Sequence, residues 1–247
     1  MRKALLGGAL ITAALLGPQA HAAPALYLLG GVDGKMLTNT DANNYFNVNS
    51  VLGPKGYGSG VAHLGLQFDR YFAVEASVDS GLDRANDMTY YNFGFPTRHI
   101  TTDWKLTTYS VTPGLTWASH DSVNMLGFRI GQANLSGHVE DDAYGANGSY
   151  DQNAQTTDYG LIFRSSTLMA DHFSVGLEFG YDWTVFNNIS NKNGTGSYDP
   201  PQSPERNVST TGHNGDQTTL DFSGGHIALV VGLWSGPPVS GRTGEDE

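Results

Sequence analysis

The chemistry-bearing residues of this sequence are charged side chains inside segments of alternating apolar and polar residues. Alternate residues of a β-strand point to opposite faces of a sheet, so such segments gather their charges on one face. If those faces meet inside a closed sheet, opposite charges must pair, because an unpaired buried charge is costly. We predict a structural ion-pair network of Glu75, Arg129, Asp158, Arg164 and Glu178, accompanied by His63, Gln67 and His226. The alternative is that these pairs exchange partners and gate a minor conductance.

Other polar residues could act as metal ligands or catalysts. The run Glu140-Asp141-Asp142 offers the oxygen ligands that a divalent cation prefers, but a solvated acidic loop is the favoured interpretation. Candidate catalytic groups near segment ends are Asp33, Asp79, His99, Asp103, His138 and Asp182. They form no local signature such as His-x-Ser-x-Ala, and no tight group of acids beside a histidine. We therefore predict no enzymatic activity, no cofactor and no metal site.

The composition narrows the class of protein. The 247 residues include 32 glycines and no cysteine, and the formal net charge is −11. Frequent glycine together with many aromatic residues suits strands and turns better than helices. The absence of cysteine excludes disulfides and thiolate metal sites. The acidic excess argues against nucleic acid as a partner, because nucleic acid requires a basic surface.

Residues 1–22 have the three parts of a secretory signal peptide. Arg2 and Lys3 precede an apolar run from Ala4 to Gly17, and Ala20-His21-Ala22 supplies the small residues of a cleavage site. The apolar run of about 14 residues is shorter than the roughly 20 that a membrane-spanning helix needs. We expect export and cleavage before Ala23.

Eight later segments have the character of strands. They run approximately over Leu26–Gly34, Gly60–Phe68, Phe72–Asp79, Trp104–Trp117, Val123–Leu135, Thr157–Ser165, His172–Phe186 and Thr219–Trp234. Short connections follow the second, fourth and sixth segments. Polar connections of about 20 to 30 residues follow the first, third, fifth and seventh segments, as in outer-membrane barrels. A soluble sandwich has no reason to sort its loops in this way. Residues 23–235 are therefore predicted to form an eight-stranded antiparallel up-and-down transmembrane β-barrel, with a polar lumen and an apolar face toward lipid.

Aromatic residues stand at or near the ends of the predicted strands. In a transmembrane barrel, such residues form girdles at the two membrane interfaces. The predicted girdle residues are Tyr71, Phe72, Trp104, Trp117, Tyr181, Trp183, Phe186 and Trp234.

Several segments resemble the outer membrane protein A-like family of eight-stranded barrels. They are the hairpin Leu64-Gly-Leu-Gln-Phe-Asp-Arg-Tyr-Phe-Ala-Val-Glu-Ala-Ser-Val, Tyr109-Ser-Val-Thr-Pro-Gly-Leu-Thr-Trp, Phe128-Arg-Ile-Gly-Gln-Ala-Asn-Leu and His172-Phe-Ser-Val-Gly-Leu-Glu-Phe-Gly-Tyr. The resemblance covers most of Ala25 to Trp234. It implies a structural barrel in the cell outer membrane, with both termini in the periplasm and long extracellular loops. The implied partners are outer-membrane lipid and lipopolysaccharide, the barrel-assembly machinery, and extracellular ligands of the loops. A minor channel or an adhesive, surface-contact role would suit such a barrel, although an eight-stranded lumen is too narrow for an open pore.

The sequence departs from the family pattern in two places. The last strand ends Val231-Gly-Leu-Trp-Ser and is followed by further residues, so the terminal aromatic of the family is missing unless Trp234 substitutes for it. Residues 236–247 are expected to form a disordered acidic tail. The peptidoglycan-binding domain of larger family members has no counterpart in this sequence, so anchoring to the cell wall is not expected. Two other functions remain as alternatives. One is a small outer-membrane barrel enzyme acting on lipid A or peptides, and the other is a soluble exported β-sandwich that binds a ligand.

Overall fold

The computed structural model of the chain describes residues 24–38, 56–81, 84–92, 95–118, 122–143, 146–170, 172–187, 190–196 and 220–235. The predicted signal peptide (1–22), most of the first predicted long loop and the predicted acidic tail (236–247) lie outside these ranges. Within them, no helix is long and apolar enough to cross a membrane.

The regular secondary structure of the described residues consists of β-strands. The strands are β1 (Ala25–Leu37), β2 (Gly56–Gln67), β3 (Phe72–Gly81), β4 (Arg84–Asn92), β5 (Phe95–Ala118), β6 (Ser122–Ala143), β7 (Ala146–Ala170), β8 (Phe173–Phe186), β9 (Ser190–Gly196), β10 (Leu220–Asp221) and β11 (Gly224–Trp234).

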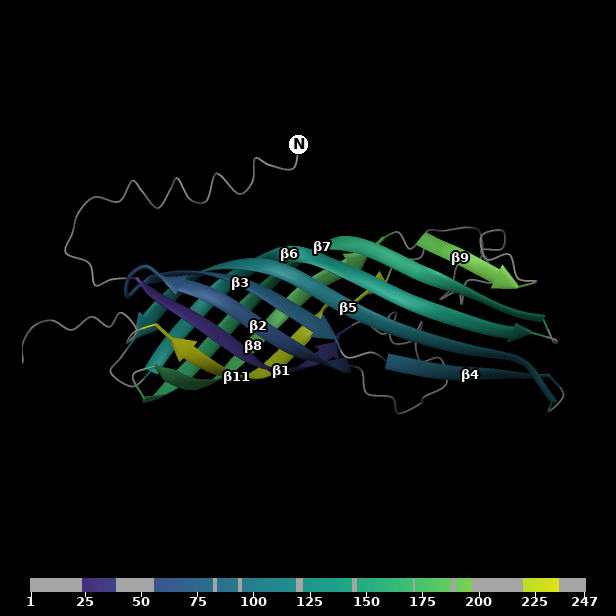
Figure 1. The fold of residues 1–247 in the computed structure, drawn as a ribbon, viewed down its shortest axis with the longest axis horizontal. Coiled ribbons are helices and arrows are strands. Elements are labelled where there is room, and N and C mark those ends of the chain that lie inside the picture. Colours follow the sequence, from purple (N-terminus) through teal and green to yellow (C-terminus); the bar gives the residue numbers. More distant parts are fainter. Residues whose placement is uncertain are drawn as a thin grey trace, which may run out of the picture.

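Eight of these strands close into an antiparallel barrel (Figure 1). Strands β1, β2, β3, β5, β6, β7, β8 and β11 pair in that order, and β11 returns to pair with β1. The order around the barrel is therefore the order along the chain. The predicted eight-stranded up-and-down barrel is confirmed.

The barrel has two unlike ends. At one end, which we call the short-turn end, β1 begins, β11 ends and brief connections join the strands. One such connection is fixed by Asp69, whose Oδ1 accepts the backbone N–H groups of Tyr71 at 2.7 Å and Phe72 at 2.8 Å. At the other end, which we call the extended end, β5, β6 and β7 run on past the rest of the barrel (Figure 1).

The long loops predicted after the third and fifth strands are wrong, because both segments form strands. Strands β6 and β7 stay paired from Ser122↔Thr167 out to Ala143↔Ala146, which leaves a two-residue connection. Strand β4 pairs with β5 from Arg84↔Trp104 to Asn92↔Phe95. Sequence alternation misses such hairpins because it detects a strand with one apolar face, and these segments are rich in polar residues throughout.

The long loop predicted after the seventh strand also contains strands. Strand β9 pairs with β7 from Gly148↔Gly196 to Asn153↔Ser190, and β10 pairs with the end of β8. Strands β4, β9 and the projecting parts of β5 (95–105), β6 (134–143) and β7 (146–155) form one sheet in the order β4-β5-β6-β7-β9, here called the extension.

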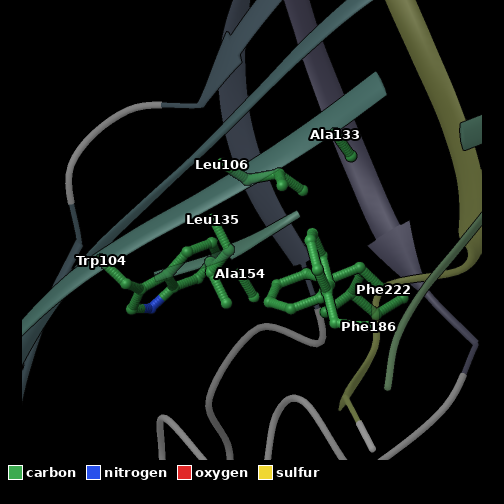
Figure 2. Close-up of a cluster of buried hydrophobic side chains, with 8 residues drawn as sticks. Trp104, Leu106, Ala133, Leu135, Ala154, Phe186 and Phe222 are labelled. Atoms are coloured by element: carbon green, nitrogen blue, oxygen red, sulfur yellow. The ribbon is translucent and has the colours of Figure 1, made fainter. Parts of the chain in front are cut away.

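Two apolar clusters fill the lumen near its ends. The mouth cluster, at the extended end, comprises Leu37, Trp104, Leu106, Ala133, Leu135, Ala154, Phe186 and Phe222 (Figure 2). Tyr57 packs against it. The base cluster, toward the short-turn end, comprises Ala25, Tyr27, Leu29, Val61, Val123, Ala228, Val230 and Trp234.

The predicted aromatic girdles are correct only in part. Trp117 and Trp183 point outward, as do Tyr71 and Phe72 at the short-turn end. The buried aromatics Trp104, Phe186 and Trp234 point into the lumen, so the girdle prediction is wrong for these three. Their place near a strand end does not reveal which face they occupy, because both ends of the lumen are lined by apolar side chains.

Candidate functional site

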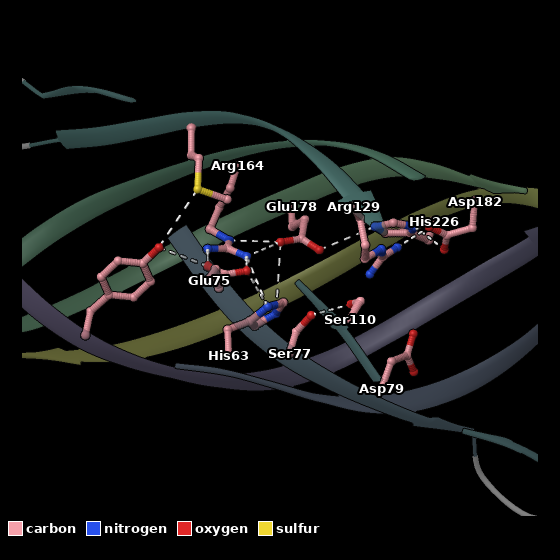
Figure 3. Close-up of polar contacts among 12 residues, drawn as sticks. His63, Glu75, Ser77, Asp79, Ser110, Arg129, Arg164, Glu178, Asp182 and His226 are labelled. Atoms are coloured by element: carbon pink, nitrogen blue, oxygen red, sulfur yellow. Dashed lines mark hydrogen bonds and ion pairs between the residues drawn. The ribbon is translucent and has the colours of Figure 1, made fainter. Parts of the chain in front are cut away.

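Arg164 lies at the centre of a buried layer of ion pairs inside the lumen (Figure 3). Its Nη1 donates to Oε2 of Glu75 at 2.6 Å and its Nη2 donates to Oε1 of the same residue at 3.0 Å. Its Nε and Nη2 also donate to Oε2 of Glu178, at 2.9 and 2.5 Å. Glu75 has no exposed surface and Glu178 is 1% exposed. One guanidinium thus joins two desolvated carboxylates, and its planar fork suits this bidentate geometry.

The register of the barrel explains how these residues meet. Arg164 on β7 is directly opposite Glu178 on β8. Glu75 reaches them from β3, on another side of a lumen that is only wide enough for its own side chains. The layer therefore ties distant strands of the barrel together.

His63 and Tyr27 complete this layer. His63 Nδ1 lies 2.8 Å from Oε1 of Glu75 and 3.3 Å from Nη2 of Arg164. The Tyr27 hydroxyl donates to Oε2 of Glu75 at 3.1 Å. Glu75 is thus held by three different side chains, as a buried carboxylate requires.

A second layer of ion pairs lies nearer the extended end and centres on Asp182. Its Oδ1 pairs with Arg129, and its Oδ2 accepts from Nζ of Lys35 at 3.2 Å. Lys35 also forms an ion pair with Asp79. These contacts join side chains from β1, β3, β6 and β8 across the lumen.

His226 connects the two layers. Its Nδ1 lies 3.1 Å from Oδ2 of Asp182, and its Nε2 lies 3.4 Å from Oε1 of Glu178. The charged side chains therefore form one continuous network along the axis of the barrel.

The residues predicted from sequence are all inside the lumen, but they are not all in contact with one another. Glu75, Arg164 and Glu178 meet in one layer, whereas Arg129 pairs with Asp182 in the second. Asp158 accepts a hydrogen bond from the Thr184 hydroxyl. The accompanying residues His63, Gln67 and His226 are buried in the lumen as well.

Sequence reasoning misses or misplaces several members of the network. It treats Asp33, Asp79 and Asp182 as candidate catalytic groups at a rim, yet they are buried in the lumen. A signal for two of them is present, because Asp79 and Asp182 each lie four residues after a predicted lumen glutamate, on the same face of the strand. Lys35 gives no such signal, since the first segment is apolar on both faces.

The other candidate catalytic residues lie on the extension. Asp103 on β5 and His138 on β6 are on its outer face and directly paired in register. His138 Nδ1 lies 2.8 Å from Oδ1 of Asp151, its partner on β7. The side chain of His99 lies outside the described part of the chain. In that part, no group of three or more His, Asp or Glu side chains is arranged to hold a metal ion.

The buried charges of the lumen have an acidic excess. The carboxylates are Asp33, Glu75, Asp79, Asp158, Glu178 and Asp182, and the lysine and arginine residues are Lys35, Arg129 and Arg164. Lys35 and Arg164 each contact two carboxylates, whereas Arg129 contacts Asp182. Such shared pairing holds the side chains of Lys35 and Arg164 firmly in place.

A small cavity lies beside the Arg164 layer, toward the short-turn end. It is lined by Tyr27, Gln67, Thr116, Met125, Arg164 and Trp234, among others. Its size suits about one water molecule, far less than a ligand-binding pocket requires.

Searches against known proteins returned structural matches only. No protein family matches the sequence, and no curated protein matches it. The chain is similar in fold to small outer-membrane barrels. Ail, the attachment invasion locus protein of Yersinia pestis, shares 10% identity at a TM-score of 0.46, over 86% of this chain and 99% of Ail. The outer membrane protein OprG from Pseudomonas aeruginosa shares 9% identity at a TM-score of 0.45, over 88% of this chain and 99% of OprG.

A major outer membrane protein from Thermus thermophilus matches similarly, with 13% identity and a TM-score of 0.46 over 84% of this chain and 98% of that protein. The predicted resemblance to small outer-membrane barrels is confirmed at that level, and no match singles out the outer membrane protein A-like family. At these identities and TM-scores, the likeness carries no inference about function.

Proposed function

We propose that this protein is an outer-membrane β-barrel that holds a stiff β-sheet outside the cell for contact with other surfaces or ligands. The observation that carries the proposal is the outer surface of the barrel. It has an apolar belt at barrel level and a polar face on the extension, so the surface changes character where the strands leave the barrel.

The belt consists of large apolar side chains that point away from the lumen. They are Leu26, Leu28, Val32, Leu64, Phe72, Tyr109, Val111, Leu115, Trp117, Leu126, Phe128, Ile130, Tyr159, Leu161, Phe163, Leu177, Phe179, Trp183, Ile227, Leu229, Val231 and Leu233. Soluble monomers rarely expose a continuous apolar patch larger than a few hundred Å². A belt around a closed barrel has the form that lipid requires, because a closed barrel leaves no unpaired backbone groups.

The height of the belt agrees with a bilayer. On β5 it runs from Tyr109 to Trp117, about 27 Å along the strand at the usual rise. With a strand tilt of about 40°, this distance corresponds to about 21 Å along the barrel axis. The apolar band of outer-membrane barrels is about 25 Å tall.

Above the belt, the outer face of the extension is polar. Asn134 on β6 accepts a hydrogen bond from Nε2 of Gln155 on β7 at 2.5 Å, and His138 contacts Asp151 further out. Cross-strand polar pairs of this kind stabilise a sheet in water. The extension is therefore suited to an aqueous space beyond the membrane.

In this proposal the belt contacts outer-membrane lipid, with lipopolysaccharide in the outer leaflet. The barrel-assembly machinery inserts the chain, and both termini lie in the periplasm. The extension is the surface available to an extracellular ligand, because the ion-pair layers and the two apolar clusters fill the lumen.

The orientation can be tested with single cysteines, since the chain has none. Ser136 is exposed on the outer face of the extension, and Arg70 is exposed in the connection at the short-turn end. In intact cells, a membrane-impermeant maleimide should label a Ser136→Cys variant and leave an Arg70→Cys variant unlabelled. Permeabilising the outer membrane should then expose Arg70→Cys.

Two further measurements complete the test. The protein should sediment with outer membranes, and it should show different gel mobility before and after boiling. Recovery in the soluble periplasmic fraction would overturn the proposal and favour the soluble sandwich. Labelling of Arg70→Cys but not Ser136→Cys in intact cells would reverse the orientation and remove the surface role.

A further inference from the structure

The mouth cluster extends across the lumen at the extended end. It receives Tyr57 from β2, Leu37 from β1, Phe186 from β8 and Trp104 from β5. Phe222 enters from the short link between β10 and β11. Side chains from widely separated strands thus converge at one level of the barrel.

The aromatic rings of the cluster are in direct contact. Trp104 lies 5.4 Å from Phe222 and 5.5 Å from Tyr57 between ring centroids, and Phe186 lies 5.7 Å from Phe222. Phe186 has no exposed surface, Phe222 is 3% exposed and Trp104 is 5% exposed. Because their planes are tilted or nearly perpendicular, the rings interlock edge to face, the arrangement that aromatic pairs prefer. Figure 2 shows the rings of Trp104, Phe186 and Phe222 gathered beside Leu135 and Ala154.

The charged network begins directly beneath the cluster. Leu37 follows Lys35 by two residues on the same face of β1, and Phe186 follows Thr184, the partner of Asp158, on β8. The Nζ atom of Lys35 lies 5.9 Å from the centroid of the Tyr57 ring. The apolar layer therefore separates the ion pairs from the solvent at the extended end.

We propose that the mouth cluster is a hydrophobic seal, and that it, rather than the ion-pair network, excludes water and ions from the lumen. A narrow apolar constriction does not hold a continuous column of water, so it blocks ions without a charged barrier. The ion pairs alone would form a weaker barrier, since charged side chains attract water wherever water can reach them. The seal is a property of the lumen, and it does not depend on the surface role proposed for the extension.

The seal predicts the reactivity of a thiol placed immediately below it. Ser59 faces the lumen opposite Asp33, two residues further into the barrel than Tyr57, and is 2% exposed. Its hydroxyl makes no hydrogen bond within the described part of the chain, so Ser59→Cys is a mild change. In detergent, a charged methanethiosulfonate reagent should modify Ser59→Cys about 100-fold more slowly than the exposed control Ser136→Cys, because reaction requires local opening.

Removing the seal should expose the thiol. In the Ser59→Cys background, Trp104→Ala with Phe222→Ala should raise the rate of modification toward that of the control. Glu75→Gln weakens the ion-pair layer without touching the cluster and should leave the rate low. Retention of the gel shift on boiling verifies that each variant is folded. If the double variant does not fold, Phe222→Leu alone should still give an intermediate rate, because it removes two of the aromatic contacts.

Conductance in planar bilayers provides a control for the other end of the lumen. The unmodified protein, the Glu75→Gln variant and the variant lacking Trp104 and Phe222 should all conduct poorly, because the base cluster still closes the short-turn end. Two results would overturn the proposal. One is rapid modification of Ser59→Cys in the otherwise unmodified protein. The other is opening by Glu75→Gln with no effect of the aromatic substitutions.

Discussion

The phenol ring of Tyr27 lies so close to Gly65 that a methyl group on residue 65 would overlap the ring carbon Cζ. The two residues are direct partners across β1 and β2, and the ring continues from there to reach Glu75. The absence of a side chain at position 65 is thus what allows Tyr27 to donate to the buried carboxylate.

Gly65→Ala should therefore destabilise the barrel. The added methyl group forces Tyr27 to move and weakens its hydrogen bond to Glu75, and overpacking of this kind costs about 1–3 kcal/mol. Urea unfolding in lipid vesicles, followed by tryptophan fluorescence, measures the change. The matched control is Gly60→Ala on the same strand, where a methyl group would meet no atom within 4 Å. Equal effects of the two substitutions would contradict the packing account.

Loss of the Arg164 charge should be more harmful than loss of an exposed charge. Arg164→Met leaves Glu75 and Glu178 facing each other without a shared cation, and breaking a buried pair costs about 3–5 kcal/mol. Arg70→Met, at an exposed turn, should change the free energy of unfolding by about 1 kcal/mol or less. Adding Glu75→Gln and Glu178→Gln to Arg164→Met should recover part of the loss. A triple variant less stable than the single variant would show that the charges are not what holds this layer together.

The apolar belt predicts where a charge on the outer surface is costly. Leu229 points outward from the middle of β11 and is 49% exposed. Leu229→Arg should lower the free energy of unfolding from lipid vesicles by about 2–4 kcal/mol, the cost of an arginine at the bilayer midplane. Ser136→Arg, on the outer face of the extension, should have almost no effect. A similar cost at both positions would mean that the belt does not mark the membrane.

The outer part of the extension should be dispensable for folding. Replacing residues 138–151 by an Asn-Gly turn shortens β6 and β7 but retains Leu135 and Ala154, so the mouth cluster stays intact. We expect the gel shift on boiling and the urea midpoint to remain close to those of the full chain. A longer deletion of residues 134–155 removes both cluster residues and should lower the midpoint clearly. Failure of the shorter variant to fold would show that the extension belongs to the folding unit.

The barrel itself could be predicted from the sequence because its strands have one apolar and one polar face. On β3, for example, Val74 and Ala76 alternate with Glu75 and Ser77, and this alternation places Glu75 in the lumen. Strand number and order follow from such segments and from the sorting of short and long connections. The extension could not be predicted in this way, because its strands are stabilised by pairing with neighbours and not by burial of an apolar face in a membrane.

Members of the ion-pair network could be predicted only on strands whose alternation shows which face is polar. Arg164 and Glu178 both lie on polar faces of recognised strands, so the sequence predicts that they share the lumen. The partner of Arg129 could not be derived, since the choice between Asp182 and a glutamate depends on how side chains cross the lumen. Lys35 lies where β1 is apolar on both faces, so its pairing with Asp79 becomes visible only in three dimensions.

The continuous strands of the extension fix the distance between the apolar belt and the far end of the sheet. Between Ile130 in the belt and Ala143 at its end, β6 continues for roughly 43 Å, which at a tilt of about 40° is a height of roughly 33 Å. A flexible chain of the same number of residues would have a mean reach of about 20 Å and would vary around it continually. In the proposed function, the sheet would instead act as a rigid spacer. A ligand bound at its far end would be held at one stand-off distance from the bilayer, so the length of β6 and β7, more than the affinity of the contact, would decide how closely two surfaces approach.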